Sequence, residues 1–405
     1  MNSSPASDPL LIYAAAFLRS LSVGLTGVLL AVHLAAAGWD AMRIGLLVTA
    51  GLAGGALATL VVSLLGDRLG RRRTLVGLSL LSGGGAVALA STPVLPALLL
   101  GAFLGMVNGM GRDRGAAFSL DQAILPQTAL PEARTRVFAR YTVVLDAGHA
   151  LGSLLASLPF ALRRWAGLPL LDSYRVTWLL VALLAVLTAL VYARLSPGAE
   201  PLSEATPRKL SPHSRGVVAK LAALSGLDSL GGGFLTATLL SYWFFRRFGI
   251  GEELLGPLFF AARIANAVSY LAAAALARRI GLVNTMVFTH LPSSFLLMAV
   301  PLAPSFSLAV GFFLARECLV EMDVPTRQSY LVGVVRPEER TFASGITNLA
   351  RNTAWAVAPS LAGSAMKALA FSSPLFIGAG LKIAYDVLLF AAFRRLKPPE
   401  EEGRQ

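Results

Sequence analysis

The chain has 405 residues, of which 55% are hydrophobic and only 14% are charged, against about 25% charged residues in an average soluble domain. Apolar stretches long enough to cross a hydrocarbon layer of about 30 Å recur along nearly its whole length, which excludes an ordinary soluble globular protein. The formal net charge of +13 does not indicate a nucleic-acid partner, because Lys and Arg lie mainly in short segments between apolar runs. One cysteine and four scattered histidines give neither a disulfide framework nor a metal cluster, so we expect no cofactor.

Twelve apolar runs predict twelve transmembrane helices. The first six lie near residues 10–37, 44–65, 74–89, 94–125, 137–162 and 176–193. A polar segment with four prolines follows and is typical of an extended linker. The second six lie near residues 217–245, 254–276, 282–302, 306–335, 342–371 and 375–393. We therefore predict an all-α integral membrane protein with a six-helix bundle at 1–194, a cytoplasmic linker at 195–216 and a second six-helix bundle at 217–405.

An internal repeat supports the two pseudo-symmetric bundles. A shift of 206 residues aligns the pattern P-E-x-R-T at 131–135 with the same pattern at 337–341. A shift of 211 residues aligns Leu69-Gly70 with Ile280-Gly281, in the turns after the second and eighth runs. Duplication of a six-helix unit is the simplest explanation of both alignments.

The distribution of basic residues predicts the orientation in the membrane. With the N-terminus inside, twenty Lys and Arg residues lie in cytoplasmic segments and seven on the opposite side. Because basic segments resist transfer across the bilayer, we expect a multi-pass protein of the cell (inner) membrane with both termini cytoplasmic. The lipid bilayer is thus its first expected partner.

Residues 63–72, with the sequence S-L-L-G-D-R-L-G-R-R, follow the second run. They resemble the signature G-x-x-x-D-R/K-x-G-R-R/K of the major facilitator superfamily (MFS), with serine in place of the first glycine. The resemblance implies the two-bundle fold and transport by alternating access. In that family a loop arginine pairs with an acidic residue at the cytoplasmic end of helix 4, which implies Asp121 as the partner of Arg71. The predicted cytoplasmic gate is Asp67, Arg68, Gly70, Arg71, Asp121 and Asp323; a merely solvated positive loop is the alternative.

Glycines in the fifth run match a second family pattern only in part. Gly148 and Gly152 keep the spacing of the antiporter motif, but its proline is missing. Close packing of small residues against another helix is the alternative interpretation.

Ionisable residues inside the apolar runs are the most informative chemistry of the sequence. Each costs roughly 2.5 to 3.5 kcal/mol at mid-membrane, so it must be paired or face water. The resemblance implies that helices 1, 4, 7 and 10 line a central cavity, and charges fall in those runs. The predicted cavity residues are Arg19, Arg112, Asp113, Asp228, Arg263 and Arg316. Internal ion pairs that hold the bundle closed are the alternative, and the arginines are also suited to clamp an anionic substrate.

Two carboxylates in the tenth run form a predicted proton site. Glu317 and Glu321 are four residues apart and share one helical face, where two ionised carboxylates would repel each other. We therefore expect one of them to keep a proton and the pair to couple proton movement to transport. Lys382 and Asp386 are also four apart, and we expect them to neutralise each other. For His149 in the fifth run, a packed interhelical hydrogen bond and a role in transport are equally open.

No phosphate-binding loop of the type G-x-x-x-x-G-K-S/T occurs, so an ion gradient is the expected energy source. No nucleophile, base and orienting group occur at a recognisable spacing, so we do not expect an enzyme. We expect a secondary active transporter, coupled to protons and exporting small organic compounds, that functions as a monomer. Its partners are then a small-molecule substrate and a coupling proton. Uptake or exchange of an organic anion and lipid translocation are the alternatives.

Overall fold

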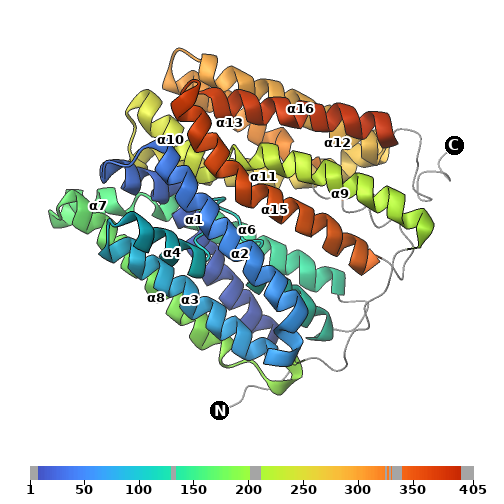
Figure 1. The fold of residues 1–405 in the computed structure, drawn as a ribbon, viewed down its shortest axis with the longest axis horizontal. Helices are drawn as coiled ribbons and strands as arrows, with labels where there is room; N and C mark the ends of the chain where they lie inside the picture. Colours follow the sequence, from blue (N-terminus) through green and yellow to red (C-terminus); the bar gives the residue numbers. More distant parts are fainter. Residues whose placement is uncertain are drawn as a thin grey trace. The chain divides into compact units, whose positions relative to one another are not determined.

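The computed structural model describes residues 8–128, 134–200, 211–323, 326, 327, 330 and 340–393. All regular structure in those ranges is helical (Figure 1). The chain forms two units: the first comprises Met1–Glu204 and Thr236–Phe260, and the second comprises Ala205–Leu235 and Ala261–Gln405.

Eight helices of the described part are long and apolar enough to cross a membrane. They correspond to runs 1, 2, 3, 5, 6, 8, 9 and 12 of the sequence, whereas the count of twelve spans stays a prediction. The other four runs contain shorter or more polar helices. The fourth run is interrupted at residues 105–115 and the seventh at residues 234–236, and a hydropathy window does not detect such breaks.

In the first unit, α1 (Asp8–Ala36) is the central helix. It packs against α6 (Arg134–Leu155), α8 (Leu170–Tyr192) and α10 (Ala237–Phe248). Around it, α2 (Ala41–Leu69) packs against α4 (Leu95–Leu104), and α3 (Arg71–Ser91) packs against α8. The unit is completed by α5 (Ala116–Ile124), the 3₁₀ turn η2 (Leu125–Thr128), α7 (Leu158–Ala166), the 3₁₀ turn η4 (Pro197–Ala199) and the beginning of α11 (Glu252–Ile280).

In the second unit, α9 (Pro212–Gly233) packs against α15 (Arg340–Ala368) and α16 (Ser373–Phe393). The helix α12 (Leu282–Ala299), continued by η5 (Val300–Leu302), packs against α13 (Phe306–Val320) and α16. The core of the unit is apolar and aromatic, and its buried members are Leu221, Val283, Met286, Val287, Tyr330, Tyr385, Leu389 and Phe393.

The glycines of the fifth run bring α6 into backbone contact with α1. A Cβ added at Gly152 would lie 2.1 Å from the carbonyl oxygen of Leu21, and one added at Gly148 would lie 2.7 Å from the Cβ of Ser20. No larger residue fits at such an approach. The glycine spacing therefore has a packing role in this chain, whether or not it also serves transport.

The backbone between α4 and α5 leaves the helical path over residues 105–115. Met106 and Gly111 have positive φ angles of 51° and 71°, so the backbone forms turns there and the helix does not continue. Asn108 stabilises the segment, because its side chain donates to the carbonyl of Arg112 over 2.7 Å and accepts from the N–H of Met110 over 2.9 Å. Irregular backbone at membrane depth needs such partners, since lipid offers none.

The start of α10 supports the same segment. Thr238 donates to the carbonyl of Gly109 through both its N–H, over 3.1 Å, and its hydroxyl, over 3.0 Å. Its hydroxyl also lies 3.0 Å from the carbonyl of Gly27 in α1. The irregular segment is thereby fixed against α1 and α10.

Candidate functional site

A buried ionic cluster lies in the first unit around Arg19 of α1. Its guanidinium contacts the carboxylates of Asp113, in the irregular segment, and of Asp121, in α5, the latter at 3.0 Å. Asp121 is completely buried. Its carboxylate also accepts hydrogen bonds from the hydroxyls of Tyr141 in α6, over 2.9 Å, and Tyr192 in α8, over 3.0 Å. Four helices and the irregular segment therefore meet at one arginine.

His149 of α6 contacts the irregular segment at Asp113, a member of this cluster. The N–H of Asp113 donates to His149 Nε2 over 2.9 Å. An accepting nitrogen carries no proton, so the imidazole is neutral with its proton on Nδ1. Of the two interpretations of His149, the structure thus shows the interhelical hydrogen bond.

The structure places the predicted gate residues in two different environments. Asp121 was expected opposite Arg71, but it lies in the Arg19 cluster, because α5 turns its carboxylate towards α1. Arg71 begins α3, where its N–H donates to Glu200 Oε2 over 2.8 Å and the N–H of Arg72 donates to Oε1 over 3.2 Å. Glu200 therefore caps α3, a role that no sequence motif indicated.

The rest of the predicted gate loop is a tight turn. Gly70 has a φ of 85° and joins α2 to α3. Arg68 is exposed, whereas the side chain of Asp67 lies outside the described part of the chain. Nothing in the described contacts of this loop yet assigns it a gating role, which stays a prediction.

The second unit contains a larger ionic network around Asp228 of α9. Lys382 of α16 lies 2.8 Å from Asp228 Oδ1, and Arg327 lies 2.9 Å from Oδ2. Arg327 also lies 3.2 Å from Asp323. Asp228 and Asp323, predicted as a cavity residue and a gate residue, are thus joined through Arg327.

His290 of α12 extends the network to a third carboxylate. Its Nδ1 lies 2.9 and 3.1 Å from the two oxygens of Asp386, and its Nε2 lies 3.3 Å from Lys382 Nζ. The expectation that Lys382 and Asp386 neutralise each other is therefore incomplete, because both contact His290 of α12 and Lys382 also contacts Asp228 of α9. Sequence reasoning missed His290, since an isolated histidine in an apolar run has no distinguishing pattern.

Both networks join the first and the fourth run of their half, with the charges inverted, and of their members Asp121 and Arg327 align at the 206-residue shift of the predicted repeat. Arg19 and Asp228 are 209 residues apart, and Asp121 and Arg327 are 206 residues apart. Each unit thus pairs the helix of its first run with residues of its fourth run. In the first unit the arginine comes from the first run, whereas in the second it comes from the fourth.

The predicted proton site faces two polar residues of α11. Glu317 is buried, contacts the guanidinium of Arg316, and accepts from the amide of Asn266 over 2.8 Å. One turn on, the hydroxyl of Tyr270 donates to Glu321 over 3.2 Å. The two carboxylates do lie on one face, but each has its own hydrogen-bond donor on α11.

The remaining predicted cavity residues lie near these clusters. Arg112 is half-buried in the irregular segment, and Arg263 is half-buried on α11, one turn before Asn266. The structure therefore gathers the predicted site residues into an Arg19 cluster, an Asp228 network and a Glu317 pair rather than one constellation.

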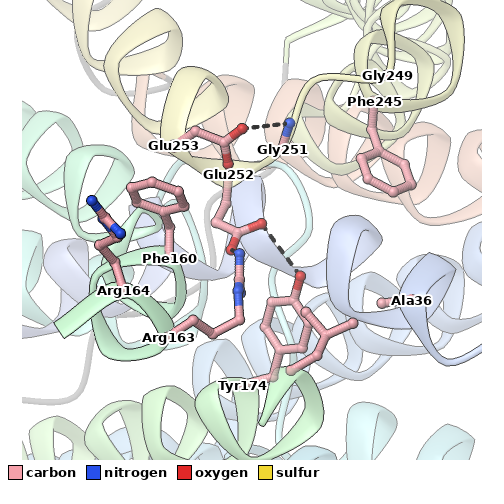
Figure 2. A pocket seen from close by; sticks show the side chains of 11 residues that line it. Ala36, Phe160, Arg163, Arg164, Tyr174, Phe245, Gly249, Gly251, Glu252 and Glu253 are labelled. Atoms are coloured by element: carbon pink, nitrogen blue, oxygen red, sulfur yellow. Dashed lines mark hydrogen bonds and ion pairs between the residues drawn. The ribbon is translucent and has the colours of Figure 1, made fainter. Parts of the chain in front are cut away.

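A cavity of about 580 Å³ lies in the first unit at the end of α1 that carries Ala36 (Figure 2). Arg163 of α7 reaches across it to Glu252 at the start of α11, with 2.5 Å between their charged atoms. Glu252 also accepts from the hydroxyl of Tyr174 in α8 over 3.3 Å. The sequence did not indicate this site, because its residues come from three separate helices.

Comparisons with known proteins agree with this architecture. A family model described as Major Facilitator Superfamily matches residues 12–319. An uncharacterized membrane protein of Saccharomyces cerevisiae is 27% identical to the chain over an alignment of 423 positions, which covers 95% of this chain and 94% of the yeast protein.

Two solved structures share the fold. The nucleoside transporter NupG superposes with a TM-score of 0.75 at 14% identity, covering 95% of this chain and 99% of its own. A D-xylose-proton symporter superposes with a TM-score of 0.74 at 14% identity, covering 96% and 98%. With a family model spanning most of its length, the chain belongs to the major facilitator superfamily of membrane transporters.

Proposed function

We propose that this transporter couples the movement of a small organic compound to that of protons. The carrying observation is the buried Glu317, which is held between the guanidinium of Arg316 and the amide of Asn266. When Glu317 takes up a proton, its ion pair with Arg316 is lost and the guanidinium becomes available to another anion. A proton and a substrate group then compete for connected sites, which is the requirement for coupled exchange.

We assign substrate contact to the predicted cavity residues Arg19, Arg112, Asp113, Asp228, Arg263 and Arg316. Within them, arginines outnumber carboxylates by two to one, and guanidinium binds carboxylate or phosphate groups in a bidentate manner. This excess favours a substrate with an anionic group. Uptake or exchange of an organic anion is therefore the second candidate function.

Export is the direction we propose, because α6 keeps the glycine spacing of the antiporter pattern. We also propose that both termini are cytoplasmic, as the basic residues predict, with the turn at Gly70 and the Asp323–Arg327 pair on the cytoplasmic side. In that orientation the Arg163–Glu252 pair lies at the opposite, extracytoplasmic end of α1.

Flux measurements in proteoliposomes test the coupling. Vesicles carrying a pH-sensitive dye are exposed to uridine, D-xylose and a panel of small aromatic carboxylates as probes, with and without an imposed pH gradient. We expect at least one probe to drive proton movement, and we expect Glu317→Gln to uncouple the two fluxes. The matched control is Glu253→Gln, in the cavity at the end of α1.

The outcome separates the candidates. Proton movement opposite to that of the probe supports exchange, and hence export of the substrate driven by protons that flow inward. Proton movement in the same direction as the probe supports uptake. Probe flux that ignores the gradient and is unchanged in Glu317→Gln would contradict proton coupling through this residue.

A further inference from the structure

An imidazole bridges an ammonium group and a carboxylate in the interior of the second unit. His290 lies on α12, and its two ring nitrogens face Lys382 and Asp386, which are one turn apart on α16. Lys382 also contacts Asp228 of α9 over 2.8 Å. The four residues form a continuous hydrogen-bonded path, and all four are buried.

The chemistry of the donors fixes where the protons reside. A lysine ammonium can only donate, so the nitrogen of His290 that faces it, Nε2, must accept. The ring is then neutral and carries its proton on Nδ1, which donates to Asp386 over 2.9 Å. Both hydrogen bonds of the imidazole therefore point from Lys382 towards Asp386.

The donors and acceptors of these two hydrogen bonds can exchange roles without any change in the net charge of the three residues. We propose that Lys382, His290 and Asp386 form a proton-transfer chain anchored by Asp228. A proton leaves Lys382 Nζ for His290 Nε2 while the Nδ1 proton passes to an oxygen of Asp386. At the Nε2 end an N–H bond of Lys382 breaks and an N–H bond of the imidazole forms; at the Nδ1 end an N–H bond of the imidazole breaks and an O–H bond of Asp386 forms. The products are a neutral amine, the other imidazole tautomer and a carboxylic acid. The amine then takes up the next proton.

The charged surroundings favour the starting state. Asp228 holds the ammonium of Lys382, and it is shared with Arg327, which also contacts Asp323. Arg351 of α15 acts on Asp228 electrostatically. On the far side, the ring of Tyr385 packs edge-on against His290 at 5.9 Å between centroids. A displacement of α9 that withdraws Asp228 removes the stabilisation of the ammonium and drives the proton towards Asp386.

The proton-transfer chain rests on the proposed proton coupling only for its use in transport. The positions of its protons can be measured without any substrate. Full-length protein with ¹⁵N-labelled histidine, reconstituted in lipid, gives four imidazoles to observe: His33, His149, His213 and His290. The His290 signals are assigned by their loss in His290→Gln, with His149→Gln as the assignment control. At pH 7 we expect His290 to be neutral, with Nδ1 protonated and Nε2 unprotonated.

A second variant tests the link to lysine. Lys382→Met leaves His290 between Asp386 and Asp228, whose Oδ1 lies 3.9 Å from Nε2. We expect the ring to become a doubly protonated imidazolium at pH 7, because both of its nitrogens then face carboxylates. Lys367→Met, at the exposed end of α15, removes the same charge and should leave the His290 signals unchanged.

Two results would overturn the proposal: a proton on Nε2 in the unmodified protein, or a His290 signal that is the same in Lys382→Met as in the unmodified protein. Either result leaves the flux experiment on Glu317 untouched. Conversely, flux that ignores a pH gradient would refute proton coupling while leaving the measured proton positions valid.

Discussion

Removal of the charge of Arg19 should destabilise the first unit far more than removal of one of its partners. Arg19→Met leaves two buried carboxylates, those of Asp113 and Asp121, without their arginine partner. Stripping one partner from a buried ion pair costs about 3 to 5 kcal/mol. Asp121→Asn leaves Arg19 paired with Asp113 and removes one charge-assisted hydrogen bond, which is worth about 1.5 to 3 kcal/mol.

The double variant isolates the interaction. In Arg19→Met/Asp121→Asn only the carboxylate of Asp113 lacks its arginine partner. The loss in free energy of unfolding should therefore be smaller than the sum of the two single losses by about 2 to 3 kcal/mol. Equilibrium unfolding of the purified protein in mixed micelles of increasing SDS content, followed by tryptophan fluorescence, measures the three free energies. The control cycle uses the exposed Asp172–Arg175 pair, whose charged atoms are 2.9 Å apart and whose coupling should be only about 0.2 to 1 kcal/mol. Additivity within about 0.5 kcal/mol at Arg19 and Asp121 would refute the reasoning.

Three further predictions address packing, capping and the cavity of Figure 2. Gly54→Ala should lower the free energy of unfolding by about 1 to 3 kcal/mol, because the added Cβ would lie 1.8 Å from the carbonyl oxygen of Phe103. Gly55→Ala, whose added Cβ would have nothing within 4 Å, should be neutral or stabilising by up to about 1 kcal/mol. Equal effects of the two substitutions in melting experiments would contradict the close approach of α2 and α4. Glu200→Ala should cost about 0.5 to 2 kcal/mol by uncapping α3, whereas Glu200→Gln, which keeps one acceptor, should cost less; the same melting assay gives the order, and the reverse order argues against a cap. Arg163→Glu should destabilise the protein by about 3 kcal/mol, because it places a second carboxylate against Glu252. Arg163→Glu/Glu252→Arg should recover most of that loss. A double variant no more stable than the single one would show that this ion pair does not contribute to stability.

Helix positions were predictable where the sequence is uniformly apolar. The runs at 10–37 and 176–193 are α1 and α8 to within a few residues at most ends, because hydropathy and length fix a spanning helix. The run at 94–125 was not predictable in this way, because a hydropathy average over a window does not detect an interruption of the helix. Met106 and Asn108 form that interruption through a positive φ and two local hydrogen bonds, which depend on geometry rather than polarity.

The charged residues were predictable as a set but not as pairs. An ionisable side chain in an apolar run must find a partner, so Arg19, Asp228 and Glu317 could be nominated from the sequence. Which partner it finds depends on how helices far apart in the chain are rotated against one another. The resemblance therefore implied Arg71 as the partner of Asp121, whereas the structure pairs Asp121 with Arg19. The tyrosines that complete its hydrogen bonds were not predicted.

The inverted charges of the two units also bear on how each half enters the membrane while the protein is being synthesised. Arg19 enters the membrane with α1, but Asp113 and Asp121 follow 94 and 102 residues later. At about 5 to 20 residues per second, that interval is roughly 5 to 20 s. In the second unit it is a carboxylate that arrives first, because Asp228 precedes Arg327 by 99 residues and Lys382 by 154. Each half thus begins its cotranslational insertion with a charge whose partners have not yet been synthesised, which costs roughly 2.5 to 3.5 kcal/mol at mid-membrane until they arrive.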